Sequence, residues 1–305
     1  MTYAHVDMHD EFETLPQMPP WITQVGVDSP EDAVFLSGAA LSFLHHVLHG
    51  SGVPLVLLRA RLALQAAEAC VALSGRSERA GALRDEVHLL RPGDQPGPAG
   101  ATLIQWQKAV EHPVSVGAVA RALSKMQGEE IAEWLDAGQI RGQGDTVARA
   151  ATVLESVLRA HPQDEVTAAI LADATLAQAL GWDHIVPLLA VGLKPSDWRK
   201  TGTALRLACH QAVLAAVQGA HPLAADLTRR TARLQAVTPK LRAKGAGTAA
   251  QMFLCRDAVT PAELSASISG TGLSDRGARR FCERLVELGA VRELTGRETF
   301  RIYGV

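Results

Sequence analysis

The amino-acid sequence predicts a mainly α-helical fold. Apolar residues make up 47% of the 305 residues but aromatic residues only 4%, so alanine and leucine dominate the apolar content. This composition favours closely packed helices over a β-sandwich or barrel. The chain is long enough for two cores. We expect a flexible N-terminal tail over residues 1–28, an all-helical domain over 29–240 and a smaller domain over 241–305.

Capping residues and Gly or Pro breaks mark the helices of the all-helical domain. Ser29 followed by Pro30, Glu31 and Asp32 predicts a helix start, with a cap, a proline at the first position and acids at the positive end of the dipole. This helix, to about His49, is apolar nearly all round and is predicted to be a buried central helix. Nine further helices are expected over 55–73, 78–90, 101–111, 115–125, 129–137, 145–160, 164–180, 196–218 and 222–236.

The C-terminal residues carry signals for two helices joined by a glycine turn. Thr260 followed by Pro261 predicts a helix start, because Thr caps free amides and Pro at the first position loses no hydrogen bond. This short helix, expected over residues 262–268, stops at a Ser-Gly-Thr-Gly stretch. Ser274 then caps a longer helix that ends at Gly289. Its apolar face is formed at helical spacing by Ala278, Phe281, Leu285 and Leu288.

A β-hairpin is expected after the second of these helices. Residues 291–294 and 298–303 alternate apolar with polar side chains on either side of a short Thr-Gly-Arg loop. The order of helix, turn, helix and hairpin is that of a winged helix-turn-helix. The sequence therefore predicts a winged helix-turn-helix with a small hairpin wing after a multi-helix body.

The predicted DNA contacts are arginines of this segment. With its apolar face turned inward, the second helix presents Arg276, Arg279, Arg280 and Arg284 on its outer side, whereas the hairpin carries Arg297 and Arg301. Guanidinium groups bind phosphates and read guanine edges in the major groove. A competing interpretation is that Glu283 and Glu287 pair with these arginines in a solvated face. Winged helices also serve as protein-docking modules.

The charge distribution favours the DNA interpretation. Residues 226–305 hold 14 Lys and Arg against 8 Asp and Glu, a net charge of +6, whereas the whole chain carries −2. A basic segment on an acidic body is typical of a protein that meets a polyanion. Part of the excess comes from six residues before the winged helix, which either follow a phosphate track or solvate a connecting helix: Arg229, Arg230, Arg233, Lys240, Arg242 and Lys244.

Other candidate sites are weaker. His45 and His49 share a helix face at a spacing that zinc sites use, but a third ligand is not evident, and we expect neither metal nor cofactor. The glycine-rich loop Arg91–Gly100 could cradle a phosphate, yet it lacks the P-loop order and its prolines remove amide donors. A rigid connection between helices is the better interpretation. Without a catalytic motif, the sequence offers no case for an enzyme.

The sequence also bears on the cellular setting. The four cysteines, at positions 70, 209, 255 and 282, form no Cys-x-x-Cys pair, which favours reduced thiols in a cytoplasmic protein. The acidic N-terminus lacks the charged and apolar regions of a signal peptide. Since no apolar run reaches the ~20 residues of a membrane span, we expect no membrane contact.

Five stretches of the chain carry a resemblance to a known family: PEDAVFLSGAALSFLHHVL, RARLALQAAEACVALSGR, LRDEVHLLRPGDQPGPAG, LGWDHIVPLLAVGLK and VRELTGRETFRIYGV. They resemble the bacterial family labelled domain of unknown function 1403, from about Pro30 to Val305. The most specific pieces are residues 91–94 with 96–100, and residues 293–297. The resemblance implies a bacterial and often plasmid-borne protein, without an established activity.

The tail is also similar to the winged helix at the C-terminus of many Fic-type proteins. There a Leu-x-x-Leu-Gly-x-hydrophobic run precedes a Thr-Gly-Arg turn, and residues 285–289 and 295–297 fill those positions here. The Fic catalytic loop, His-Pro-Phe-x-Asp-Gly-Asn, is absent from the sequence. The resemblance therefore implies a fold for the tail and no AMP transfer.

Our leading hypothesis is a DNA-binding protein that regulates or maintains a bacterial plasmid or mobile element. Its partner would be double-stranded DNA, and the helical body would provide a surface for a homodimer or another protein. The alternatives are a protein-docking module and, less favoured, a metal-dependent helical enzyme that uses His45 and His49.

Overall fold

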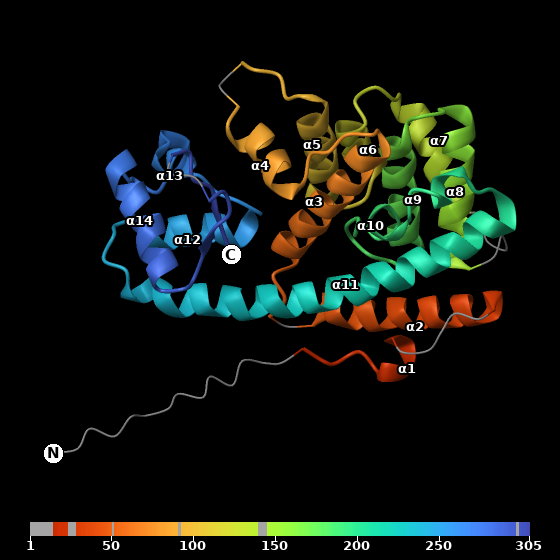
Figure 1. The fold of residues 1–305 in the computed structure, drawn as a ribbon, viewed down its shortest axis with the longest axis horizontal. Coiled ribbons are helices and arrows are strands. Elements are labelled where there is room, and N and C mark those ends of the chain that lie inside the picture. The colour runs from red at the N-terminus through yellow and green to blue at the C-terminus, as the bar shows by residue number, and fades with distance from the viewer. Residues whose placement is uncertain (1–14, 24–28, 51, 91–92, 140–144, 297–298) are drawn as a thin grey trace.

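The computed structural model describes residues 15–23, 29–50, 52–90, 93–139, 145–296 and 299–305 (Figure 1). This part of the chain is mainly helical, as the composition predicts, and holds fourteen α-helices and a two-stranded sheet. The α-helices of the body are α1 (Pro20–Thr23), α2 (Pro30–His49), α3 (Leu55–Leu73), α4 (Ala80–His88), α5 (Pro98–Glu111), α6 (Val116–Ala122), α7 (Gly128–Gly138), α8 (Thr146–Ala160), α9 (Glu165–Ala179), α10 (Leu189–Gly192) and α11 (Gly202–Val237).

The remaining elements follow α11 and form what we call the C-terminal unit, residues 246–305. They are α12 (Ala246–Cys255), α13 (Pro261–Ser265), η3 (Ser267–Ser269), α14 (Asp275–Glu287), β1 (Arg292–Glu293) and β2 (Tyr303–Gly304). Two further 3-10 turns, η1 (Asp197–Arg199) and η2 (Thr238–Lys240), flank α11.

The capping residues start helices where the sequence predicts. Ser29 forms a complete capping box with Asp32 at the start of α2. Asp145 accepts hydrogen bonds from the backbone N–H groups of Val147 and Ala148 at the start of α8. Three helices were not foreseen, namely α10, α12 and α1. Helix α1 lies within the expected tail, and its Ile22 is buried. Residues 1–14 and 24–28 of that tail lie outside the described residues.

The core of the body is built around α9 rather than α2. All residues of α9 from Thr167 to Ala177 are buried. By contrast, α2 buries one face, and Val34 and Phe35 on its other face are exposed. The expectation of a central helix over residues 30–49 was therefore wrong. An apolar circumference does not by itself decide which helix becomes central, because that depends on how many neighbours pack around it.

One long helix connects the body to the C-terminal unit. The sequence predicts separate helices over 196–218 and 222–236, but α11 runs without a break from Gly202 to Val237 and contains Pro222. Helix α11 lies beside α2 along the base of the molecule and reaches the C-terminal unit at one end (Figure 1). Ala220 and Ala224, on either side of Pro222, are both buried, and their packing keeps the two halves of the helix aligned. Packing therefore outweighs the local penalty for proline.

The strands of the C-terminal unit are shorter than predicted. Only Arg292 and Glu293 pair with Gly304 and Tyr303 in the antiparallel sheet, instead of residues 291–294 with 298–303. Phe300 has a φ of 55°, which takes the backbone out of the extended conformation before β2. Val259, two residues before α13, exchanges two backbone hydrogen bonds with Tyr303 at 2.8 and 2.9 Å.

A buried ion cluster fastens the C-terminal unit to the body. The carboxylate of Asp257 forms an ion pair with Arg61 Nε of α3 at 2.7 Å and accepts a hydrogen bond from Arg84 Nε of α4 at 2.6 Å. Arg61 Nη2 also donates to the Val305 carbonyl oxygen at 2.8 Å. All three charged side chains are almost fully buried. Because unpaired buried charges are costly, this cluster fixes how the two parts meet.

Candidate nucleic-acid interface

Helix α14 is positioned by signals at both of its ends. Ser274 Oγ accepts a hydrogen bond from the Gly277 backbone N–H, and Gly289, with a φ of 63°, ends the helix. Its apolar face packs inward through Ala278, Phe281, Cys282 and Leu285, all of which are buried. The opposite face of α14 is therefore turned to solvent.

The four predicted arginines of α14 are all exposed, but they do not share one surface. Arg276, Arg280 and Arg284 form a row at i, i+4 spacing, which we call the outer row. Arg279 belongs to the adjacent row with Asp275 and Glu283, and this row lines a cleft between the C-terminal unit and the body. The structure therefore brings three of the arginines together and separates the fourth.

Helix α14 has fewer ion pairs than it would have if Glu283 and Glu287 paired with all of its arginines in a solvated face. Arg284 Nη1 pairs with Glu287 at 2.8 Å. Within the described part of the chain, the predicted contacts of Glu283 with Arg279 and Arg280 do not form, and Arg276 has no acidic partner either. Two guanidinium groups of the outer row, those of Arg276 and Arg280, are thus available to an anion.

The hairpin arginines differ from those of α14. Arg301 lies 3.6 Å from a carboxylate oxygen of Glu293, and a hydrogen bond with Tyr303, together with the charge of Glu293, raises the pKa of Arg301. Arg297 lies outside the described residues. Of the two predicted wing contacts, only Arg301 can be placed, and it is engaged with its own hairpin.

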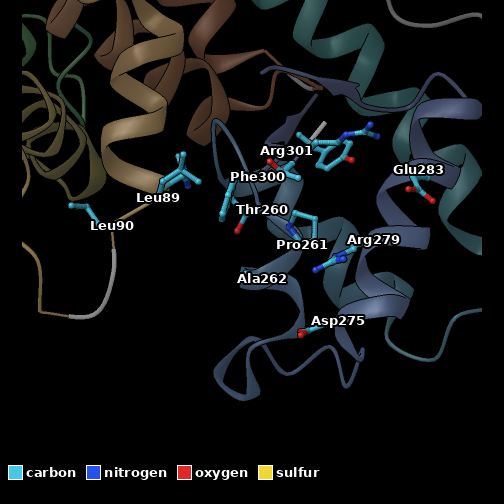
Figure 2. Close-up of a pocket in the computed structure, with 13 residues that line it drawn as sticks. Leu89, Leu90, Thr260, Pro261, Ala262, Asp275, Arg279, Glu283, Phe300 and Arg301 are labelled. Atoms are coloured by element: carbon cyan, nitrogen blue, oxygen red, sulfur yellow. The ribbon is translucent and has the colours of Figure 1, made fainter. Parts of the chain in front are cut away.

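The cleft beside α14 has a volume of about 680 Å³ (Figure 2), and we call it the α14 cleft. On one side it is lined by the start of α13, by the row containing Arg279 and by Phe300 and Arg301 of the hairpin. The end of α4, with Leu89 and Leu90, forms the opposite wall. A cleft of this size admits a small molecule or a side chain and not a duplex, so Arg279 is less accessible to DNA than the outer row.

A second cleft of about 550 Å³ lies on the other side of His88, and we call it the Arg59 cleft. Residues of α3, α4 and α5 form its body side, and residues 255–258 with Glu263 form the other. His88 lines both clefts, and its Nδ1 lies 3.4 Å from Glu263 Oε1. Burial would raise the pKa of Glu263, but hydrogen bonds from His88 and Thr260 and the charge of His88 outweigh it and lower the pKa.

The basic residues of α11 have structural partners. Arg229 and Arg230 both pair with Asp226, at 3.4 and 2.7 Å. Arg233 Nε donates to the Leu288 carbonyl oxygen at 3.0 Å and so caps the C-terminal end of α14. For these three residues, the structure favours support of the helices over a phosphate track.

The histidine cluster of α2 is engaged with the protein itself. His45 Nδ1 accepts a hydrogen bond from Trp182 Nε1 at 3.0 Å, and His49 Nδ1 lies 2.8 Å from the His45 carbonyl oxygen. Over the residues that the structure describes, no group of three or more His, Cys, Asp or Glu side chains is arranged to hold a metal ion. His45 and His49 therefore lack the third ligand that a zinc site needs.

The glycine-rich loop before α5 is closed by a carboxylate of the protein. Glu86 Oε2 accepts a hydrogen bond from the Gly100 backbone N–H at 2.7 Å, in the first turn of α5. An anion at this helix start would have to displace Glu86, which favours the interpretation of a rigid connection. Arg91 and Pro92 of this loop lie outside the described residues.

One arrangement of catalytic residue types escaped the sequence analysis. Ser37 Oγ lies 2.7 Å from His210 Nδ1, and His210 Nε2 lies 3.5 Å from a carboxylate oxygen of Asp145. Ser37 is only 1% exposed, and its hydroxyl donates to the Val34 carbonyl oxygen. A serine nucleophile must reach its substrate, so this group serves to connect α2, α11 and the start of α8. Its members are 173 and 65 residues apart in sequence, and no local pattern reveals them.

None of the described helices is long and apolar enough to cross a membrane.

Comparisons with known proteins place the chain in a family. The sequence has no significant match among curated proteins. A family model described as protein of unknown function (DUF1403) matches residues 6–305, which extends the expected resemblance toward the N-terminus. The chain belongs to the DUF1403 family.

Proposed function

We propose that the C-terminal unit is a winged helix-turn-helix. The first helix would be α12, which the sequence analysis did not foresee, followed by Val259 as a minimal first strand, α13, α14 and the hairpin of β1 and β2. The pairing of Val259 with Tyr303 supports this arrangement, because it adds a third strand position to the hairpin. The likeness of the tail to Fic-type winged helices supports it as well.

We further propose that this unit binds double-stranded DNA through the outer row of α14. The observation that carries this function is the row itself: Arg276 and Arg280 are exposed on the helix that follows the turn, and no acid within the described residues neutralises them. Arginines in this position contact phosphates and base edges when such a helix enters the major groove. Arg284, Arg297 and Arg301 would add contacts at the edges of this DNA-binding surface. Arg279 would contribute less to the affinity for DNA.

The test is salt-dependent binding to duplex DNA, measured by fluorescence anisotropy with the full-length protein. In the Arg276→Gln/Arg280→Gln variant, two phosphate contacts are lost, so the slope of log affinity against log salt should fall by about 2. The matched control is Arg121→Gln/Arg206→Gln, which removes the same charge from exposed positions on α6 and α11. Circular dichroism should show unchanged helix content in both variants.

Two results would contradict the proposal. Equal affinities of wild-type protein and the Arg276→Gln/Arg280→Gln variant would show that the outer row does not contact DNA. An equal loss in the control variant would show that only net charge matters.

The biological setting that we propose is regulation or maintenance of a bacterial plasmid or mobile element in the cytoplasm. The bacterial and plasmid context is implied by the resemblance that the sequence carries, whereas the cytoplasm is favoured by the pattern of the cysteines. The body would then supply a surface for a second copy or another protein. Exposed Trp21 of α1 stacks on exposed Phe35 of α2 with ring centroids 5.7 Å apart, and this apolar surface supports such a role.

A docking module is the second candidate function. Ile268 of η3 is 98% exposed and Phe300 of the hairpin 73% exposed. Large apolar side chains of this kind serve as anchors in many protein contacts. This function would be favoured if the protein showed no salt-sensitive DNA binding and captured a partner whose binding Ile268→Ser abolishes and Arg276→Gln leaves intact.

A further inference from the structure

Arg59 of α3 places a positive charge in a cleft. Its side chain is half-buried and lines the Arg59 cleft. The Nε atom is shielded from solvent and finds no acceptor among the residues that the structure describes. Burial lowers the pKa of Arg59, and the charge of Asp183 offsets this only in part. Most buried donors in proteins are paired, so an unpaired one calls for an explanation.

The other charges that face the Arg59 cleft are already engaged. Asp257 is held between Arg61 and Arg84, and Glu263 contacts both His88 and Arg256, each at 3.4 Å. Glu111 lies at the rim with its side chain mostly exposed, 3.8 Å from His112. Among the charged groups that line the cleft, Arg59 is the one with a buried polar atom, Nε, that finds no hydrogen-bond partner within the described residues.

The remaining lining is suited to a small apolar molecule. Val56 and Ala60 of α3, Val87 of α4, Val110 of α5 and Ala258 contribute the apolar surface. Binding sites for small molecules commonly have volumes of about 300–1,000 Å³ and combine apolar walls with a few polar groups that fix orientation. The volume of about 550 Å³ and the position of Arg59 fit this description.

We propose that the Arg59 cleft binds a small, largely apolar molecule that carries one carboxylate, and that Arg59 pairs with this carboxylate. The planar guanidinium group matches a carboxylate at fork geometry. The neighbouring acids Glu111 and Glu263 disfavour ligands of higher negative charge, such as a phosphate monoester. This inference does not depend on DNA binding.

The position of the Arg59 cleft gives such a ligand contacts with both parts of the molecule. One wall consists of helices of the body, and the other contains residues 255–258, which lead directly into Val259 and α13. A bound carboxylate would therefore contact the segment that joins α12 to α13.

Cys255 provides a reporter for this site. It lines the Arg59 cleft and is exposed, whereas Cys70, Cys209 and Cys282 are buried. The thiolate of Cys255 displaces iodide from either iodoacetamide, which is neutral, or iodoacetate, which carries a carboxylate. The full-length protein is treated with each reagent, and the rate of alkylation at Cys255 is measured by peptide mass spectrometry.

We expect benzoate to slow the reaction with iodoacetamide in a saturable way, since it occupies the cleft. In Arg59→Gln, protection by benzoate should be lost and the ratio of the iodoacetate rate to the iodoacetamide rate should fall several-fold. The rate with iodoacetamide alone should stay near that of the wild type, which verifies that the fold around Cys255 is intact.

Arg256→Gln is the comparison variant, because Arg256 is adjacent to Cys255 but exposed and paired with Glu263. It should retain saturable protection by benzoate. Absence of protection in the wild type, or equal protection in wild type and Arg59→Gln, would overturn the proposal. Loss of protection in Arg256→Gln alone would also overturn the proposal, because the effect would then come from the charge of Arg256 beside the thiol.

Discussion

At the residue scale, His210 shows how burial turns a polar group into a source of pH dependence. It lies between Ser37 and Asp145, and desolvation lowers its pKa below the ordinary value of 6.5 although Asp145 opposes the shift. When the folded pKa lies below the unfolded one, the unfolded state binds the proton first as the pH falls. The stability associated with neutral His210 is therefore present above about pH 6.5 and is lost as the pH falls through the folded pKa.

We predict that the wild type loses stability relative to His210→Asn as the pH falls below about 6.5. Asparagine can replace the Nδ1 contact with Ser37 but does not titrate. The measurement is the free energy of unfolding in urea at a series of pH values, compared between the two proteins. A difference that does not change with pH would show that His210 does not couple folding to protonation.

Asp173 provides a comparison of opposite sign. It is fully buried on α9, and desolvation raises its pKa to about 7, although the backbone N–H groups of Leu188, Leu189 and Ala190 lower it. The stability contributed by protonated Asp173 is fully present below pH 3.8, the ordinary pKa of an aspartate. It is lost as the pH rises through the folded pKa of about 7. The wild type should therefore lose stability relative to Asp173→Asn as the pH rises, the reverse of the trend for His210.

At the scale of elements, helix starts were predictable where a side chain defines them. Ser29, Thr260 and Ser274 each cap a helix in the structure, as the sequence predicts. Asp145, the first residue of another expected helix, caps α8. The signal is local, because the capping oxygen and the amide that it accepts from lie two or three residues apart.

Elements without a local signal were missed. Helix α12 begins after Gly245, which has a φ of 90° and no capping side chain. A Cβ at Gly245 would lie 1.9 Å from the carbonyl oxygen of Thr271, so a residue 26 positions away in sequence makes glycine necessary. The single strand position at Val259 likewise depends on its partner Tyr303. Contacts of this range are set by tertiary packing and leave no periodic pattern.

Pro222 inside α11 leads to a prediction about this helix. Proline in a helix interior costs about 3 kcal/mol, since it removes a hydrogen bond and its ring displaces the preceding turn. Pro222→Ala should therefore raise the free energy of unfolding, by up to about 3 kcal/mol. The control is Pro30→Ala at the first position of α2, where no amide hydrogen bond is missing and no gain is expected. Destabilisation by Pro222→Ala in urea unfolding would show instead that the local distortion is needed for packing.

At the scale of the whole molecule, the sequence predicts which residues of the candidate site are exposed but not which surfaces they share. The 3.6-residue period places Arg276, Arg280 and Arg284 opposite the apolar face of α14. It cannot show that Arg279 lines a cleft, because the opposite wall comes from the end of α4, nearly 190 residues earlier. The Arg59 cleft is also formed by segments distant in sequence. Both clefts lie between the body and the C-terminal unit, which the ion pairs of Asp257 connect.

The ion cluster predicts that the wild-type chain unfolds as one cooperative unit. Asp257→Asn leaves Arg61 and Arg84 buried without their carboxylate, which should cost about 3–5 kcal/mol. Asp226→Asn is the matched control, because Asp226 also pairs with two arginines but is partly exposed, and its loss should cost at most about 1 kcal/mol.

Two probes separate the parts of the molecule. All five tryptophans lie before residue 200 and report on the body, whereas the buried thiol of Cys282 in α14 reports on the C-terminal unit. In the wild type and in Asp226→Asn, tryptophan fluorescence and Cys282 reactivity should change at the same urea concentration. In Asp257→Asn, Cys282 should become reactive at a lower concentration than the one that changes the fluorescence, because the C-terminal unit has lost its attachment. Coincident transitions in that variant would mean that α11 and the apolar contacts, rather than the buried charges, join the two parts.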